Sequence, residues 1–146
     1  MSTFDPSTAK PYVDPDSPAL AEWITRASPG TKASYRETAA QRIVNAFKAD
    51  DVAGVLMHAE RVMPKAVRKG IKRAAERAGA KSAGEFFAQH AGEVLAGRFT
   101  GRGSWRAQAK KWLAEASDHV ARVAGVRADA PVLAKIASLT NQEKTS

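Results

Sequence analysis

Residues 104–125 read "SWRAQAKKWLAEASDHVARVAG" and form the longest helical pattern in the chain. Apolar residues recur three and four positions apart, which is the spacing of one helix face. Ser104 is placed to cap the N-terminus, and Gly125 is placed to end the helix. The pattern predicts a helix of about five turns. Its apolar stripe is Trp105, Ala109, Trp112, Leu113, Ala116, Val120 and Val123.

The same period appears in the segments on both sides of this helix. Further helices are predicted to start at Ser17, Ser34, Asp50 or Asp51, Pro64, Ser82 and Asp129, and Ser34 and Ser82 each have a glutamate at capping-box spacing. No segment alternates as a strand, and no Asn-Gly or Asp-Gly hairpin turn is present. No heptad pattern outlasts one short helix. The predicted fold is all-α, a compact orthogonal bundle of about seven short-to-medium helices.

The length of 146 residues suits one domain. Residues 1–16 contain three prolines and three aspartates and are predicted to form a flexible acidic arm. Residues 17–140 form the predicted helical domain, and 141–146 a polar tail. The predicted core contains Trp23, Tyr35, Ile43, Phe47, Val55, Leu56, Phe87, Leu95, Trp112 and Leu113.

Composition narrows the function classes. The chain has no cysteine, which excludes disulfides and thiolate metal sites. No apolar run approaches the roughly 20 residues of a membrane helix. The first residues lack the basic and apolar regions of a signal peptide, so a cytoplasmic protein is expected.

Positive charge is concentrated in the middle of the chain. The net charge is +8 and the pI is about 10.0. Residues 61–111 contain thirteen Lys or Arg against three Glu, a net of +10, while the rest of the chain is slightly negative. A localised basic segment favours an anionic partner, above all nucleic acid.

The segment 64–79 concentrates this charge on one helix face. On a helical wheel, Val67, Ile71, Ala74, Ala75 and Ala78 fall within one arc. Six cations and only one acid, Glu76, occupy the opposite arc. A solvated face usually mixes signs, whereas this one places like charges four residues apart. The predicted phosphate-binding residues here are Lys65, Arg68, Lys69, Lys72, Arg73 and Arg77.

The segment 98–112, "RFTGRGSWRAQAKKW", is a second basic region. Its glycine-rich turn precedes a helix N-terminus, which is a geometry that suits an anion. Trp112 is expected in the core, and core packing is also favoured for Trp105 over base stacking. The predicted phosphate contacts are Arg98, Arg102, Arg106 and Lys110, which are expected to share one cationic surface with the helix at 64–79.

No catalytic or cofactor motif is found. The glycine-rich turn lacks the GK[ST] of a Walker A loop, and no GxSxG or HExxH sequence occurs. A helix-turn-helix over residues 73–89 fits poorly, since Glu85 occupies a position that requires a buried aliphatic residue. His58, His90 and His119 are each expected to lack a metal-spaced partner on their own helix. We therefore expect a non-enzymatic protein without a metal or cofactor.

These observations favour a small basic nucleic-acid-binding accessory protein, with DNA preferred over RNA and with phosphate contacts dominant. Its size, alanine content and basic centre would suit an accessory protein of a phage or plasmid. The alternative is a protein-interaction module, such as an inhibitor or adaptor, that docks its basic surface on an acidic partner. Binding to an anionic membrane is disfavoured, because the basic helix has mostly alanine on its apolar face.

Overall fold

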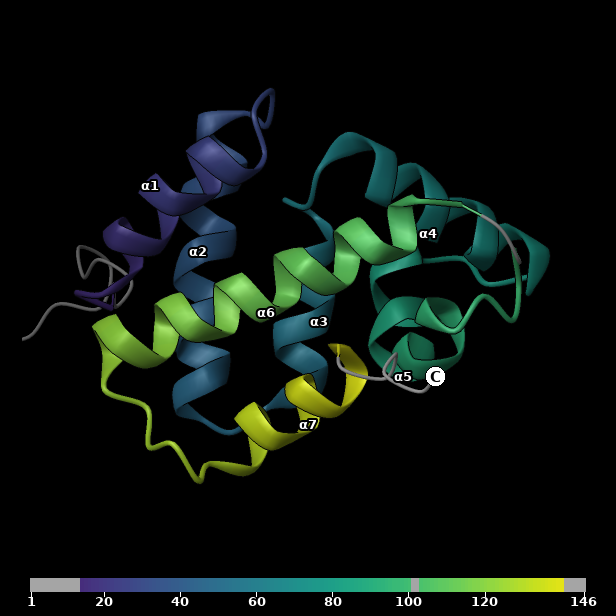
Figure 1. The fold of residues 1–146 in the computed structure, drawn as a ribbon. Helices are drawn as coiled ribbons and strands as arrows, with labels where there is room; N and C mark the ends of the chain where they lie inside the picture. The colour runs from purple at the N-terminus through teal and green to yellow at the C-terminus, as the bar shows by residue number, and fades with distance from the viewer. Residues whose placement is uncertain (1–13, 101–102, 141–146) are drawn as a thin grey trace, which may run out of the picture.

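The long helix predicted at 104–125 organises the bundle. In the computed structural model, which describes residues 14–100 and 103–140, this helix is α6 (Trp105–Ala124), and it crosses obliquely in front of α2 and α3 (Figure 1). It contacts α1, α2, α4, α5 and α7. The described residues form seven helices and no strand, which confirms the predicted class. The other six are α1 (Ser17–Ala27), α2 (Ala33–Lys48), α3 (Val52–Glu60), α4 (Lys65–Arg77), α5 (Ala83–Leu95) and α7 (Pro131–Thr140).

Six of the seven residues in the predicted apolar stripe of α6 are buried, and Val123 is half-buried. Trp105 is 7% exposed and Trp112 is 4% exposed, so both tryptophans belong to the core. The ring of Trp23 on α1 packs against that of Trp112, with centroids 5.0 Å apart. The Trp112 Nε1–H donates a hydrogen bond of 2.9 Å to the Oγ of Ser28, which follows α1. These contacts fix α1 against the middle of α6.

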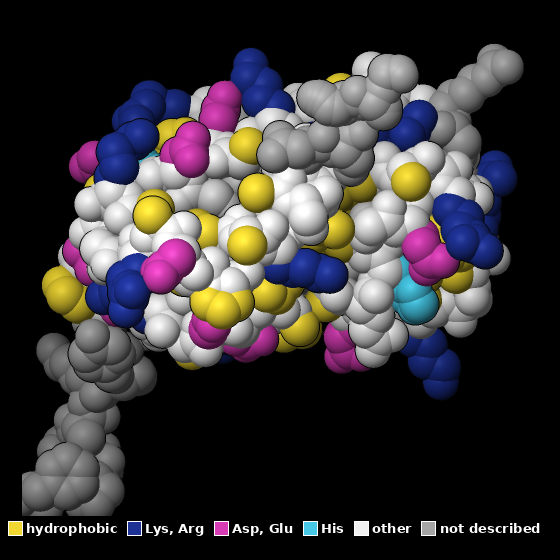
Figure 2. Space-filling view, turned by 60° about the horizontal axis from the view of Figure 1, so that its bottom comes forward, with side chains coloured by type: hydrophobic (Ala, Val, Ile, Leu, Met, Phe, Trp, Pro, Cys, Tyr) yellow, Lys and Arg dark blue, Asp and Glu magenta, His cyan; other side chains and the backbone are white. Residues whose placement is uncertain are grey.

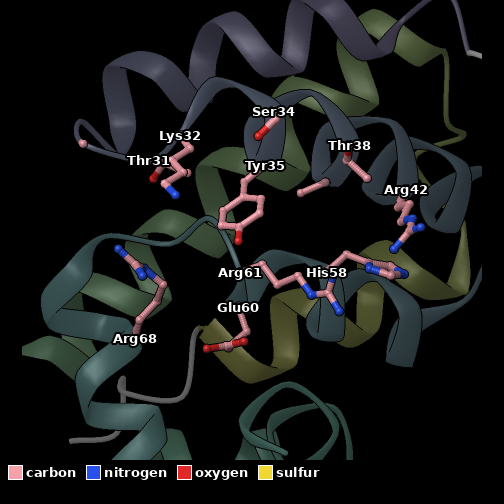
Figure 3. Close-up of a pocket in the computed structure, with 12 residues that line it drawn as sticks. Thr31, Lys32, Ser34, Tyr35, Thr38, Arg42, His58, Glu60, Arg61 and Arg68 are labelled. Atoms are coloured by element: carbon pink, nitrogen blue, oxygen red, sulfur yellow. The ribbon is translucent and has the colours of Figure 1, made fainter.

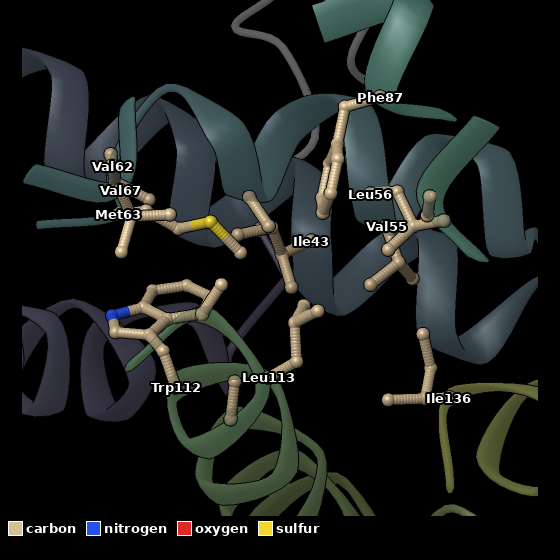
Figure 4. Close-up of a cluster of buried hydrophobic side chains, with 14 of the residues drawn as sticks. Ile43, Val55, Leu56, Val62, Met63, Val67, Phe87, Trp112, Leu113 and Ile136 are labelled. Carbon is tan, nitrogen blue, oxygen red and sulfur yellow. The ribbon is translucent and has the colours of Figure 1, made fainter. Parts of the chain in front are cut away.

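The remainder of the core joins α2, α3 and α5 to α6 (Figure 4). Eight of the ten predicted core residues are buried: Ile43, Phe47, Val55, Leu56, Phe87, Leu95, Trp112 and Leu113. Trp23 is half-buried at the edge of the core. The prediction is wrong for Tyr35, which is 59% exposed. It lies in the first turn of α2, where its side chain lines a hollow between helices.

Several helices begin and end at the capping residues that the sequence predicts. The Asp51 carboxylate accepts the Gly54 N–H at 3.0 Å, and the Ser82 hydroxyl accepts the Glu85 N–H at 3.2 Å. Gly79 and Gly125 adopt left-handed φ values of 76° and 66°, which L-residues with side chains rarely adopt.

Two other predicted serine caps are wrong, and a third is right in position only. Helix α1 includes Ser17, and the cap position is Asp16. Helix α2 begins at Ala33, so Ser34 already lies inside the first turn. Ser104 occupies the cap position of α6, but its backbone is helical and its hydroxyl accepts no capping hydrogen bond. Serine is common near helix starts, so its presence alone did not locate the first residue of α1 or α2.

Helix α7 is capped from a distant turn. Asp50 adopts a left-handed φ of 61° between α2 and α3. Its Oδ1 accepts the N–H of Val132 at 2.8 Å. The sequence assigned the start of this helix to Asp129, which instead pairs with Arg127 at 3.1 Å. Asp50 thereby joins α7 to the α2–α3 turn.

The helical domain begins before Ser17. The Asp14 side chain is buried, and its carboxylate accepts the Asp16 N–H at 2.9 Å. The Lys48 ammonium lies 2.9 Å from a carboxylate oxygen of Asp14 and 2.9 Å from one of Asp16. Residues 14–16 of the predicted arm therefore pack on the domain. The rest of that arm and the predicted tail at 141–146 lie outside the described residues. In the described part of the chain, no helix is long and apolar enough to cross a bilayer.

Candidate nucleic-acid interface

Helix α4 has two chemically distinct faces. Its inner face buries Val67, Gly70, Ile71, Ala74 and Ala75. Ala78, which the wheel placed on this face, is exposed at the C-cap. The outer face exposes five cations, which we call the α4 strip: Lys65, Lys69, Lys72, Arg73 and Arg77. None of the five lies within 4.0 Å of a carboxylate of the described residues. The helix thus presents five cations and one acid, Glu76, to solvent, without an ion pair between them.

Gly70 sets how closely α4 approaches α6. A methyl group at this position would overlap the indole ring of Trp105. The ring therefore lies directly against the α4 backbone. This contact explains why Trp105 is buried and leaves the α4 strip facing outward on a firmly packed helix.

Arg68 differs from its neighbours on α4. It is half-buried, and its Nε donates a hydrogen bond of 2.9 Å to the Met63 carbonyl oxygen. This bond holds the guanidinium at the edge of a hollow beside α4. Arg68 therefore lies between the α4 strip and the other basic residues that line this hollow, among them Arg42 and Arg61.

The predicted contacts after α5 are partly committed to other partners. Arg77 donates to the Phe99 carbonyl oxygen at 3.4 Å, which places the end of α4 beside this segment. Arg98 forms an ion pair of 3.0 Å with Glu93. Arg106 is half-buried and donates to the Leu95 carbonyl oxygen at 3.2 Å. Arg77, Arg98 and Arg106 thus have other partners, whereas no such partner is found for Lys65, Lys69, Lys72 and Arg73 among the described residues.

Lys110 lies on α6, in a groove beside the end of α7. Together with Arg106 and Lys111 it lines a shallow groove that reaches Thr140 at the end of α7, and no α4 residue lines that groove. Arg102 lies outside the described residues. Of the nine described residues among the ten predicted, the five of the α4 strip are exposed and lie outside ion-pair distance of any described carboxylate.

The sequence did not identify the hollow beside α4. Its volume is about 810 Å³, and its walls come from the start of α2, the end of α3 and the start of α4. Figure 3 shows Tyr35 pointing into it, with Arg42, His58 and Arg61 converging on one side and Arg68 on the other. Hydroxyl groups of Thr31, Ser34 and Thr38 lie along the α2 wall. We call this region the α2–α4 hollow.

Four cations and one carboxylate line the α2–α4 hollow: Lys32, Arg42, Arg61, Arg68 and Glu60. Burial lowers the pKa of His58, and the nearby Arg42 and Arg61 lower it further, against a smaller opposing effect of Asp51. Burial raises the pKa of Glu60, although Arg68 and Arg61 act in the opposite direction. Burial is the main cause of each shift, and Arg61 lowers the pKa of both side chains, so this cation lies near both. The hollow is suited to an anion.

Other parts of the surface mix the two signs. Figure 2 shows the face on which α7 comes forward, where lysines and arginines alternate with aspartates and glutamates. The expectation that His90 lacks an acidic partner is wrong. Its Nδ1 lies 3.0 Å from Glu93 Oε1, one turn along α5. Within residues 14–100 and 103–140, no three potential metal ligands of the His, Cys, Asp and Glu types gather.

Comparison of the chain with protein-family models, with curated proteins and with solved structures finds no match in any of the three.

Proposed function

We propose that this protein binds nucleic acid through phosphate contacts made by the α4 strip, with duplex DNA as the first ligand to test. The observation that supports this most is the set of five exposed cations on one helix face, without a described carboxylate within ion-pair distance. The spacing of the strip along one helix suits the repeated charge of a polyanion.

The arrangement has an electrostatic cost in the unbound protein. Lys65 and Lys69 lie four residues apart, as do Lys69 and Arg73, so each pair repels. The first turn of α4 contains no acid and two cations, Lys65 and Arg68, which face the positive end of the helix dipole. A bound polyanion offsets both effects. A purely structural role for α4 does not require them, because its packing uses the opposite face.

The test compares two double variants of equal charge change. Lys69→Glu/Arg73→Glu alters the α4 strip, and Arg122→Glu/Lys135→Glu alters exposed cations on α6 and α7. Fluorescence anisotropy with a labelled duplex is expected to show that the α4 variant loses affinity on the order of tenfold or more at low salt. The control should lose much less, because long-range effects of net charge are screened.

The outcome also separates the two function classes. Equal losses in both variants would mean that net charge, and not the α4 strip, controls binding. If the wild-type protein binds neither DNA nor RNA at low salt, the nucleic-acid proposal is wrong, and docking on an acidic protein becomes the function to test.

A further inference from the structure

The α2–α4 hollow is chemically different from the α4 strip. Tyr35 lines the hollow. Among the large hydrophobic side chains of the described residues, it alone is exposed, at 59%. The Lys32 ammonium lies 5.9 Å from the centre of its ring. The α4 strip offers charge alone, whereas the hollow combines charge with an accessible aromatic face.

The α2–α4 hollow is large enough to hold a small organic group. Its volume of about 810 Å³ falls within the range of roughly 300–1,000 Å³ that sites for small organic groups occupy. Arg42 and Arg61 come together at one end, and Tyr35 lies between them and Arg68 (Figure 3). A group with a phosphate at one end and a flat ring at the other matches this order of residues.

We propose that the α2–α4 hollow binds a single unpaired nucleotide, with its phosphate between Arg42 and Arg61 and its base against Tyr35. The inference rests on the proposed function, because the nucleotide would belong to a strand whose neighbouring phosphates contact the α4 strip. Arg68 lies on α4 and lines the hollow, so it connects the two sites. A free nucleotide has the same chemistry and is the other possible source.

Aromatic stacking distinguishes this site from a simple phosphate site. Bases of any sequence stack on tyrosine, because every base has a flat π face. The phosphate contacts resemble those of the α4 strip, but the stacking contact requires a base that is not paired inside a duplex. The protein should therefore prefer DNA with a single-stranded overhang over the same duplex with blunt ends.

The experiment measures affinity by anisotropy for a blunt duplex, the same duplex with a short overhang, and a single strand. Tyr35→Leu keeps an apolar side chain but removes the ring, and Tyr35→Phe keeps the ring. Tyr35→Leu is expected to weaken binding of the overhang and the single strand roughly 5- to 100-fold, with the blunt duplex unchanged. Tyr35→Phe should bind all three like the wild-type protein. Equal effects of Tyr35→Leu on all three ligands, or none, would overturn the proposal.

A second pair of variants tests the phosphate end. Arg61→Gln should weaken binding of the overhang more than that of the blunt duplex, while Arg26→Gln, which removes an exposed cation of α1 away from the hollow, should change neither. Loss of affinity for the blunt duplex alone in Arg61→Gln would contradict the assignment.

Titration with a nucleoside monophosphate and with inorganic phosphate identifies the source. If the bound nucleotide belongs to a strand, the nucleoside monophosphate and inorganic phosphate should each bind more weakly than the overhang duplex. Tight binding of the monophosphate that Tyr35→Leu abolishes, with equal affinity for blunt and overhang duplexes, would assign the hollow to a free nucleotide and overturn its link to the α4 strip. If Lys69→Glu/Arg73→Glu changes no duplex affinity while Tyr35→Leu weakens the single strand, the proposed function fails and the hollow stands.

Discussion

Gly70 on α4 lies against the indole ring of Trp105 on α6, with no room between them for a methyl group. One residue without a side chain thus allows a large aromatic ring to be buried at the crossing of two helices. The same crossing turns the opposite face of α4, with its five cations, toward solvent. Packing and the proposed function of α4 therefore depend on opposite faces of one helix.

Gly70→Ala is expected to destabilise the protein by roughly 1–3 kcal/mol, because the new Cβ overlaps Trp105 and forces a shift. Helix propensity acts in the other direction by about 1 kcal/mol. Gly92→Ala on α5 is the matched control. A Cβ there would lie 3.7 Å from Leu139, an ordinary contact, so this change should be neutral or stabilising. Urea denaturation measures both, and equal effects of the two variants would contradict the close crossing.

Ser28→Ala tests the hydrogen bond that joins α1 to α6. It leaves the buried Trp112 Nε1–H without its acceptor, which is expected to cost about 1–3 kcal/mol. Ser117→Ala is the control, because the buried Ser117 hydroxyl has no hydrogen-bond partner among the described residues. Its removal should be neutral or stabilising. Thermal unfolding of the two variants compares them, and a larger loss for Ser117→Ala would show that this hydrogen bond is misassigned.

Asp14 is expected to make stability depend on pH. Burial alone would raise its pKa, but the Asp16 amide and Lys48 stabilise the carboxylate and hold the pKa below the ordinary value of 3.8. The unfolded chain then binds more protons as the solution becomes acidic. The stabilisation is complete above the unfolded pKa and is lost as pH falls through the folded pKa.

Asp14→Asn should therefore lower the melting temperature at neutral pH, and its difference from the wild-type protein should shrink as the pH falls below about 4. Asp129→Asn, which alters an exposed ion pair with Arg127, should have little effect at either pH. A difference for Asp14→Asn that stays constant down to low pH would show that this carboxylate is not stabilised by charge.

The sequence predicted the features that depend on local periodicity. The buried and exposed faces of α4 follow from residues three and four apart, because any neighbour must pack on the apolar arc. Gly79 and Gly125 end their helices as predicted, since a left-handed residue strongly favours glycine. Pro64 likewise precedes α4, where its missing N–H costs little.

Contacts between segments that are distant in the chain could not be predicted from the sequence. The α2–α4 hollow combines Arg42 of α2, Arg61 after the end of α3 and Arg68 of α4, and no local pattern connects them. Tyr35 fits the apolar spacing of α2, yet it lies where no neighbouring helix covers that face. The cap of α7 comes from Asp50, 82 residues before Val132. Such contacts depend on how the helices are arranged, which periodicity does not specify.

The salt dependence of DNA affinity tests the central claim most directly. If the five cations of the α4 strip each contact a phosphate, the logarithm of the association constant should fall with the logarithm of salt concentration at a slope of roughly −4 to −5. Lys69→Glu/Arg73→Glu removes two contacts and should reduce the slope to about −3, with unchanged stability because both side chains are exposed. Arg122→Glu/Lys135→Glu should keep the wild-type slope. An unchanged slope in the α4 variant, or no binding by the wild-type protein at low salt, would contradict the account.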